Sequence, residues 1–271
     1  MNNFLYKNRV KIPIQTRVEA YNLMNELKER GVSRFQLVEE INKKFEISKG
    51  AVYDWYANRG SPFGRKRLVY NKELFYVIGA LLGDGCAYHW KKKNYHLVNI
   101  AGEKEFVEKY SNKLFKCTKR KIKWHPNRNQ HIWFLNTYNF ELYLFFKKVK
   151  NDLKSLEKLI MSKNYFQNSL QFIEGFFDAE GCVKIIKEPV RITPKICLDI
   201  CCTNFEILEL VRKLLMENLN IEARYSIQKA YIAKDGHPRK TSYHLRVYKK
   251  DYIRKFFKNI NTIKLKPEKV S

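Results

Sequence analysis

The chain has 271 residues, of which 45% are hydrophobic, so it is longer than one ordinary domain and can bury at least one sizeable core. Its 53 Lys and Arg residues against 27 Asp and Glu residues give a formal charge of +26, which predicts a polyanionic partner. No stretch approaches the roughly 18 apolar residues of a membrane span, and residues 1–10 lack the apolar core of a signal peptide, so we expect an intracellular protein that is not secreted and has no membrane partner.

Residues 17–56 have the pattern of three short helices. Apolar spacing predicts a first helix that ends before Gly31, Ser33 can cap a second, and Ser48 can cap a third over residues 49–56. Two helices joined by a short turn resemble a helix-turn-helix DNA-binding unit, with an ordinary three-helix packing module as the alternative. The exposed candidates for DNA contact are Ser48, Lys49, Tyr53 and Arg59.

A basic linker follows these helices. The stretch 59–67 contains two glycines, a proline and four basic residues, a composition typical of a linker. We therefore expect residues 1–64 to form a helical extension with its linker, and we expect the linker to lie along DNA phosphates.

The rest of the chain contains an internal repeat. Residues 77–86 (VIGALLGDGC) match residues 173–182 (IEGFFDAEGC) at a constant offset of 96. Each copy is followed by the pattern strand, strand, helix, strand, strand, helix. We therefore expect an α+β fold of two pseudo-symmetric αββαββα halves, residues 65–165 and 166–271, with antiparallel DNA-binding sheets, plus a small all-α N-terminal domain.

The expected elements after the first copy are strands around residue 88 and at 96–100, a helix at 103–115, strands at 119–124 and 131–138, and a helix at 140–149. After the second copy they are strands at 182–187 and 195–203, a helix at 204–218, strands at 222–232 and 241–248, and a helix at 251–260.

Each copy is an apolar helix that ends in an acid followed by a glycine. A glycine just past a helix end can take the left-handed conformation at little cost, so we expect the chain to turn sharply there into the next strand. Within each helix, small residues four positions apart share one face: Gly79 with Gly83, and Gly175 with Ala179. Such faces let two helix backbones approach closely.

If the two helices pack along these faces, Asp84 and Glu180 emerge side by side. The two carboxylates then repel each other and face the negative ends of both helix dipoles, so a cation has to compensate them. Oxygen ligands of this kind suit Mg²⁺, which typically binds one or two carboxylates, waters and substrate phosphate oxygens. The motifs therefore predict metal-assisted phosphodiester hydrolysis.

The two copies resemble the LAGLIDADG motif of a family of homing endonucleases, and the resemblance covers about residues 70–271. It implies that the paired helices join the two halves of a monomer with internal pseudo-two-fold symmetry. It also implies that each sheet lies in the major groove of double-stranded DNA, and that both strands are cut across the minor groove at a long recognition site with short 3′ overhangs.

The resemblance also assigns ligands and cofactors. It places Asp84 and Glu180 at the metal-ligand positions and the backbone carbonyls of Gly83 and Ala179 beside them. The expected cofactor is Mg²⁺, with Mn²⁺ as a substitute and Ca²⁺ supporting binding without cleavage. Residues 263–266 resemble a family segment with a catalytic lysine, which makes Lys266 the candidate and a solvated tail lysine the alternative.

Some positions depart from the family pattern. The first half has no clean counterpart of the lysine, although Lys154 and Lys158 lie in a comparable region. Where family members often place a water-organising Gln or Asn, this chain has Gly102 and Cys202. The six cysteines form no C-x-x-C pair, so we interpret them as buried free thiols, and the histidine spacing disfavours a histidine-metal nuclease.

Alternation along residues 241–248 places Ser242, His244, Arg246 and Tyr248 on one face of a strand. Arg246 and Arg191 are candidates for contact with guanine edges, and phosphate contact or solvation is the alternative for each. The loop 234–240 has an Asp-Gly turn signal and extends the expected footprint. The DNA-contact candidates of this half are Arg191, His237, Arg239, Lys240, His244 and Arg246.

Two other functions fit the same residues. An intron RNA maturase would bind its host transcript through the same basic and aromatic residues. A non-cleaving DNA-binding regulator on this scaffold should have lost an acid, and this chain has both. The start at Met1 and the lack of splice-junction residues favour an intron-encoded or free-standing enzyme over an intein.

Overall fold

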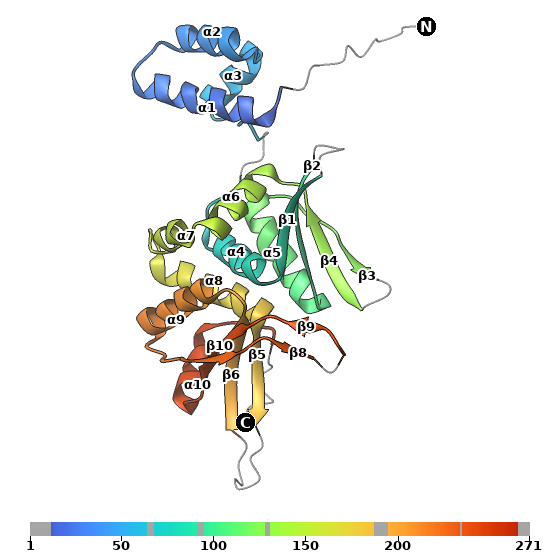
Figure 1. The fold of residues 1–271 in the computed structure, drawn as a ribbon. Coiled ribbons are helices and arrows are strands. Elements are labelled where there is room, and N and C mark those ends of the chain that lie inside the picture. Colours follow the sequence, from blue (N-terminus) through green and yellow to red (C-terminus); the bar gives the residue numbers. More distant parts are fainter. Residues whose placement is uncertain are drawn as a thin grey trace. The chain divides into compact units, whose positions relative to one another are not determined.

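The computed structural model describes residues 12–63, 68–90, 95–127, 131–186, 195–233 and 235–264 (Figure 1). The chain divides into two compact units, Met1–Leu68 and Val69–Ser271. Two residues named from the sequence, Arg191 and Lys266, lie outside the described residues, as do residues 64–67 of the linker. In the part of the chain that is described, no helix is long and apolar enough to cross a bilayer.

The N-terminal unit is all-α, as predicted, with α1 (Ile14–Glu29), α2 (Arg34–Phe45) and α3 (Lys49–Tyr56). Ser33 and Ser48 cap α2 and α3, since each hydroxyl accepts a hydrogen bond from a backbone N–H three residues later. The turn between these helices is closed by Asn42, whose Nδ2 donates to the Ile47 carbonyl at 2.7 Å. A buried apolar cluster that includes Met24, Leu37, Ile41, Val52 and Trp55 holds the three helices together.

The first half of the second unit contains α4 (Lys72–Asp84), β1 (Gly85–Trp90), β2 (Tyr95–Gly102), α5 (Lys104–Thr118), β3 (Trp124–Asn127), β4 (Ile132–Thr137), α6 (Phe140–Asn151) and α7 (Leu153–Ile160). Its strands form an antiparallel sheet in the order β1-β2-β4-β3. Helices α5 and α6 contact this sheet, and they shield the apolar side chains of β2 and β4 from water.

The second half repeats this order with α8 (Tyr165–Glu180), β5 (Gly181–Ile186), β6 (Lys195–Cys202), α9 (Phe205–Leu219), β7 (Arg224–Gln228), β10 (Ser242–Val247) and α10 (Lys250–Asn259). Its antiparallel sheet has the equivalent order β5-β6-β10-β7. A short ribbon of β8 (Tyr231–Ile232) and β9 (Pro238–Arg239) extends from it. The predicted α+β fold of two repeated halves with antiparallel sheets is confirmed.

Three features of the structure differ from the predicted elements. The strand expected at 222–232 is divided into β7 and β8. The strand expected at 119–124 begins only at Trp124, because Lys119 takes a left-handed φ of 54° to end α5 and the next residues are irregular. The short helix α7 was not expected. Asp152 begins it by accepting a hydrogen bond from the Ser155 N–H at 3.0 Å, a common capping pattern at the start of a helix.

Helices α4 and α8 pack against each other along their small residues. A Cβ atom added to Gly79 would lie 2.3 Å from the Phe172 carbonyl oxygen, and one added to Gly175 would lie 2.1 Å from the Tyr76 carbonyl oxygen. Both distances are far below contact distance, so only glycine fits at either position. The close approach predicted from the spacing of small residues is therefore confirmed.

The glycines that follow the two acids do not adopt the expected conformation. Gly85 and Gly181 have φ angles of −96° and −86°, so neither is left-handed. A Cβ atom on Gly85 would lie 2.5 Å from the Leu81 carbonyl oxygen, and one on Gly181 would lie 2.5 Å from the Phe177 carbonyl oxygen. Glycine is required because the chain turns back against the last helical turn, not because of its φ angle.

We predict that Gly175→Ala destabilises the second unit, because the added methyl group would push α4 and α8 apart at a backbone contact. Overpacking of this kind typically costs about 1–3 kcal/mol or more. Gly50→Ala in α3 is the matched control, since a Cβ there meets nothing within 4 Å, and alanine favours a helix by roughly 0.5–1 kcal/mol. Thermal denaturation followed by circular dichroism checks both variants, and a Gly175→Ala protein as stable as wild type would contradict the backbone contact.

Candidate functional site

The packing of α4 on α8 brings two acids together at one end of the helix pair. Asp84 is the last residue of α4, and Glu180 is the last residue of α8. Between them the small residues meet, because a Cβ atom on Gly83 would lie 2.6 Å from the Ala179 Cβ and 2.8 Å from the Glu180 Cγ. The side chain of Asp84 is exposed and that of Glu180 is half-buried, so the pair is accessible from outside.

The negative charges of Asp84 and Glu180 are only partly compensated by their surroundings. Desolvation raises the pKa of Glu180 to about 7, with the charge of Asp84 as the second cause. Desolvation also raises the pKa of Asp84. A divalent cation would relieve both effects, since it favours the ionised form of each carboxylate.

One lysine acts on both acids. The charge of Lys264 lowers the pKa of Asp84 and that of Glu180, opposing the desolvation. Its side chain is half-buried, and its backbone N–H donates to the Thr262 Oγ1 at 3.1 Å. Lys264 belongs to the segment named from the sequence and is the described lysine whose charge acts on both acids, whereas Lys266 lies outside the described residues and stays a prediction. Lys154 and Lys158 are exposed residues of α7.

The donor set fits a hard divalent ion only in part. Among the described residues, no three His, Cys, Asp or Glu side chains gather into a metal site. Two carboxylates therefore have to be joined by other oxygens. The carbonyls of Gly83 and Ala179 lie in the last turns of their helices, where carbonyls have no intrahelical partner. Two carboxylates completed by carbonyl, water and phosphate oxygens match the preference of Mg²⁺.

The polar face of the second sheet is arranged around a buried acid. Asp199 on β6 is fully buried, and its carboxylate forms ion pairs with Lys184 on β5 and with Arg246 on β10, where the Arg246 Nε lies 3.3 Å from the carboxylate. His244 belongs to the same cluster. It is only 7% exposed, and its Nδ1 lies 3.0 Å from the Asp199 Oδ1. The ion pair with Asp199 therefore fixes the position of the Arg246 side chain.

His244 therefore differs from the expectation that it faces outward with Arg246. Strand alternation places the two side chains on the same face, but it does not reveal that the neighbouring strand carries a buried carboxylate at that level. The imidazole turns to Asp199 and also approaches Cys201, with 3.7 Å between the Nε2 and the Sγ. Contact between His244 and an external partner stays a prediction, and the side chain has little exposed surface with which to make it.

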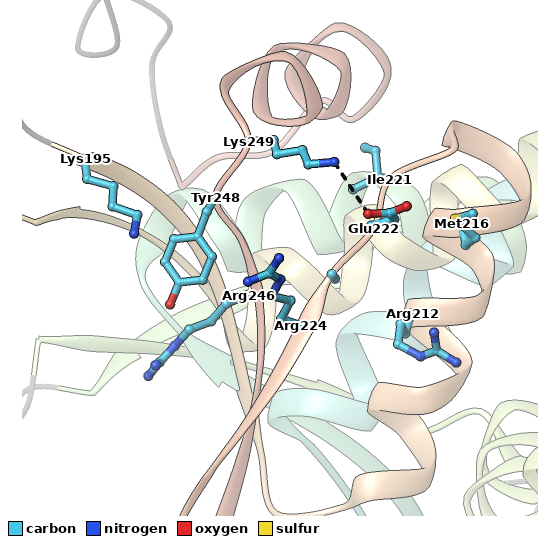
Figure 2. Close-up of a pocket in the computed structure, with 10 residues that line it drawn as sticks. Lys195, Arg212, Met216, Ile221, Glu222, Arg224, Arg246, Tyr248 and Lys249 are labelled. Carbon is cyan, nitrogen blue, oxygen red and sulfur yellow. Dashed lines mark ion pairs between the residues drawn. The ribbon is translucent and has the colours of Figure 1, made fainter.

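A basic pocket of about 620 Å³ lies at the end of this sheet (Figure 2). Arg246 and Arg224 are paired across β10 and β7 and both line it. The Lys195 Nζ lies 4.4 Å from the centre of the Tyr248 ring at the same pocket. Lys249 forms an ion pair with Glu222, the one acid among the described residues of the lining, at 3.6 Å. Cations outnumber acids around the pocket, so it favours an anionic group.

The loop candidates lie on the exposed ribbon. Gly236 has a φ of 79°, as the predicted Asp-Gly turn requires. Arg239 forms an ion pair with Asp235 at 2.9 Å, and the side chains of His237, Arg239 and Lys240 are exposed.

The candidates in the N-terminal unit each have an internal partner. The Ser48 hydroxyl caps α3, Lys49 forms an ion pair with Glu39, the Tyr53 ring stacks under the Arg34 guanidinium at 4.6 Å, and Arg59 pairs with Asp54 at 3.2 Å. All of these pairs have exposed atoms, so the four residues stay candidates for contact with a partner.

The cysteines are all free, but only Cys117, Cys197 and Cys202 are buried. Cys86 is exposed, and Cys182 and Cys201 are half-buried, so the prediction that all six are buried is wrong. The two positions that depart from the family pattern are both closely surrounded. A Cβ on Gly102 would lie 2.6 Å from the Phe106 ring, and Cys202 is 8% exposed.

Comparisons with known proteins agree with this fold. Residues 167–261 match the model of the LAGLIDADG-like domain. An uncharacterized protein of Methanocaldococcus jannaschii is 26% identical over 270 residues, which cover 93% of this chain and 92% of that protein. Because 93% of this chain is matched, the match includes at least part of the three-helix unit.

Among solved structures, mesophilic variants of the homing endonuclease I-DmoI have a TM-score of 0.50 and 20% identity, with 72% of this chain and 99% of that chain covered. They therefore share the fold over that part of this chain. A structure of I-DmoI in complex with DNA and Ca is similar at a TM-score of 0.49 and 20% identity, with 74% of this chain and 96% of that chain covered.

The raised pKa of Glu180 predicts that divalent cations bind more tightly as the pH rises, because the cation has to displace a proton. A carboxyl group with a pKa of about 7 is mostly protonated at about pH 6 and mostly ionised at about pH 8. Calorimetry with Mn²⁺ should therefore show about tenfold weaker binding at the lower pH. Glu180→Gln is the control and should show a much flatter dependence. Affinity independent of pH in the unchanged protein would contradict the raised pKa.

Proposed function

We propose that the chain is a site-specific homing endonuclease of the LAGLIDADG type that hydrolyses both strands of duplex DNA with the help of a divalent metal ion, and the match of residues 167–261 to the LAGLIDADG-like domain supports this proposal. The observation that carries this proposal is the meeting of Asp84 and Glu180 at one accessible end of the α4–α8 pair, with Lys264 acting on both. A scaffold that only binds DNA has no need of two poorly compensated carboxylates.

The site residues have separate roles in this proposal. Asp84 and Glu180 would hold Mg²⁺, or Mn²⁺ in its place, together with the carbonyls of Gly83 and Ala179. When bound, the ion supplies Lewis-acid activation of water and of the phosphate. The ammonium group of Lys264 stabilises negative charge that develops on the phosphate, and Lys266 stays a second candidate for this role. The rigid α4–α8 contact fixes the acids before DNA arrives, so little ordering is left for the reaction step.

The basic sheet and the N-terminal unit supply affinity in this proposal. The net charge of +26 is far larger than the two negative charges of the acid pair. Arg246, Arg224 and Lys195 lie around one pocket at the end of a sheet. The ribbon β8–β9 adds Arg239 and Lys240. The helical unit contributes Ser48, Lys49, Tyr53 and Arg59 through a second, independent surface. We propose the two halves at 65–165 and 166–271 as the units that contact the two sides of one long site.

We predict that Asp84→Asn or Glu180→Gln abolishes cleavage and leaves DNA binding intact. Each change removes one negative charge from the metal ligands and nearly preserves shape, while the basic surfaces stay unchanged. A target is first selected by cleavage of a plasmid library of random sequences with Mg²⁺ present or withheld. A gel shift with Ca²⁺ and a cleavage assay with Mg²⁺ on the same duplex then compare the variants.

The matched control is Glu108→Gln, which removes the charge of an exposed carboxylate on α5 away from the motif positions. It should bind and cut as the unchanged protein does. If both motif variants still cut both strands at a near-unchanged rate, the endonuclease assignment of these acids fails. If the unchanged protein binds duplexes tightly and cuts none, it is a DNA-binding regulator. Stronger binding to an intron transcript than to any duplex would instead indicate a maturase.

Phosphate contacts should dominate binding, so affinity should fall steeply with salt, with a log-log slope of about −0.9 per neutralised phosphate. Arg224→Ala should weaken binding to all duplexes alike and reduce that slope by about 1. Arg254→Ala is the control, because Arg254 is an exposed arginine of α10 paired with Asp251. A nearly flat salt dependence, or equal losses in both variants, would contradict the role of the pocket in Figure 2.

A further inference from the structure

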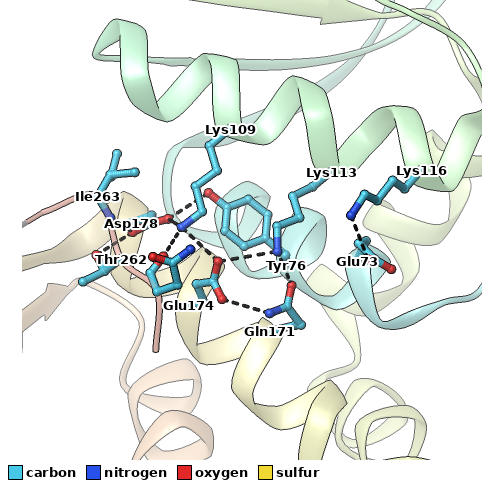
Figure 3. A network of polar contacts seen from close by, with 11 residues as sticks. Glu73, Tyr76, Lys109, Lys113, Lys116, Gln171, Glu174, Asp178, Thr262 and Ile263 are labelled. Carbon is cyan, nitrogen blue, oxygen red and sulfur yellow. Dashed lines mark hydrogen bonds and ion pairs between the residues drawn. The ribbon is translucent and has the colours of Figure 1, made fainter. Parts of the chain in front are cut away.

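A fully buried carboxylate lies between the two halves, two residues before the acid of the second motif. Asp178 of α8 accepts hydrogen bonds from the Tyr76 hydroxyl of α4 at 2.9 Å and from the Lys109 Nζ of α5 at 2.7 Å (Figure 3). Its other oxygen accepts from the Thr262 hydroxyl at 2.6 Å and from the Ile263 N–H at 3.0 Å. Four donors from three parts of the chain therefore meet on one side chain.

Lys109 strengthens the same junction from the first half. Its ammonium group contacts Asp178, pairs with the Glu174 carboxylate at 2.9 Å and donates to the Asn261 carbonyl. Lys113, one turn further along α5, approaches Glu174 at 3.5 Å. The segment 261–264 is thus tied to α8 through Asp178 and to α5 through Lys109. We call the contacts that Asp178, Lys109 and Glu174 make with one another, with Tyr76 and with the segment 261–264 the Asp178 clamp.

The clamp is absent from the related position of the other half. The repeat offset of 96 matches Asp178 with Leu82 and Glu174 with Ile78. Alignment of the first residues of α5 and α9 matches Lys109 with Leu210 and Lys113 with Leu214. These four equivalents are buried and apolar: Leu82, Ile78, Leu210 and Leu214. Apolar packing is therefore sufficient to join a motif helix to its neighbour.

A buried ionic network is a costly alternative to such packing. Ionised groups lose their hydration on burial, and replacing buried ion pairs by apolar residues is often neutral or stabilising. The clamped side contains the segment 261–264, whose Thr262 hydroxyl and Ile263 N–H donate to Asp178 and are thereby satisfied. The Asp178 clamp therefore holds this segment in place.

The last residue of this segment is Lys264, whose charge acts on both acids. Ile263 is held by its N–H on the Asp178 Oδ1, and the Lys264 N–H donates to the Thr262 Oγ1, which is itself bound to the same oxygen. Two consecutive backbone groups before the Lys264 side chain are thereby fixed to α8, the helix that ends at Glu180.

We propose that Asp178 is a positioning residue, which anchors the segment 261–264 through Thr262 and Ile263 and so holds Lys264 beside Asp84 and Glu180. This inference rests on the proposed endonuclease function for its effect on cleavage. Its structural part, the anchoring of the segment by Asp178, is independent of that function.

Two single-hydroxyl variants separate positioning from stability. Thr262→Val and Tyr76→Phe each remove one hydroxyl donor to Asp178, but only Thr262 belongs to the segment. Thr262→Val should lower the single-turnover cleavage rate about ten- to a hundredfold and leave duplex affinity unchanged, because a small displacement of a catalytic group has effects of this order. Tyr76→Phe should cut within about twofold of the unchanged protein. In a Lys264→Ala background, Thr262→Val should have no further effect.

Hydrogen exchange of the metal-free protein supplies a readout that does not depend on cleavage. The amides of Ile263 and Lys264 should exchange faster in Thr262→Val and in Asp178→Asn, and at an unchanged rate in Tyr76→Phe. Equal losses of cleavage in Thr262→Val and Tyr76→Phe, with exchange at both amides unchanged, would overturn the proposal. If no variant or parent cuts DNA, the proposed function fails, and the exchange rates still decide whether the clamp anchors the segment.

Discussion

The contact between α4 and α8 is made by backbone atoms, and the rest of the second unit is arranged around it. Gly79 and Gly175 each face a carbonyl oxygen of the other helix at a distance that no side chain could occupy. The same pairing continues to the helix ends, where Gly83 meets Ala179 and Glu180, so the acids that end the two helices come together. The sheets then follow directly from Gly85 and Gly181, which fold back on the last turns of the same helices. One contact thus sets the position of the acid pair and the starting point of both sheets.

The same helix pair contains carboxylates in opposite electrostatic situations. Asp178 is buried deeply and is surrounded by donors, so its charge is satisfied within the protein. Glu180, two residues later, is partly exposed and faces Asp84, and its pKa is raised to about 7. The first carboxylate is suited to holding structure together, and the second to binding a cation from solution. The surroundings of each carboxylate, rather than its residue type, decide which of these roles it can take.

Sequence patterns predict most of this architecture, because repeats and helix caps are local signals. The offset between residues 77–86 and 173–182, the caps Ser33 and Ser48, and the alternation of strand residues 242–247 all correspond to elements in the structure. Long-range polar partners leave no such local signal. Nothing around His244 indicates that Asp199 lies beneath it, and nothing around Asp178 indicates that Thr262 returns to it 84 residues later. The sequence also does not reveal that Thr262 and Ile263 are anchored to Asp178 just before Lys264, whose charge acts on both acids.

We propose that the contact between α4 and α8 creates a single metal centre shared by both halves. An anomalous-difference map at the manganese edge, from crystals grown with Mn²⁺ and a duplex obtained by cleavage selection, tests this proposal. We expect Mn²⁺ density bounded by the carboxylates of both Asp84 and Glu180, with Lys264 nearby. Manganese bound to only one of these acids, or at a site away from the ends of α4 and α8, would contradict it.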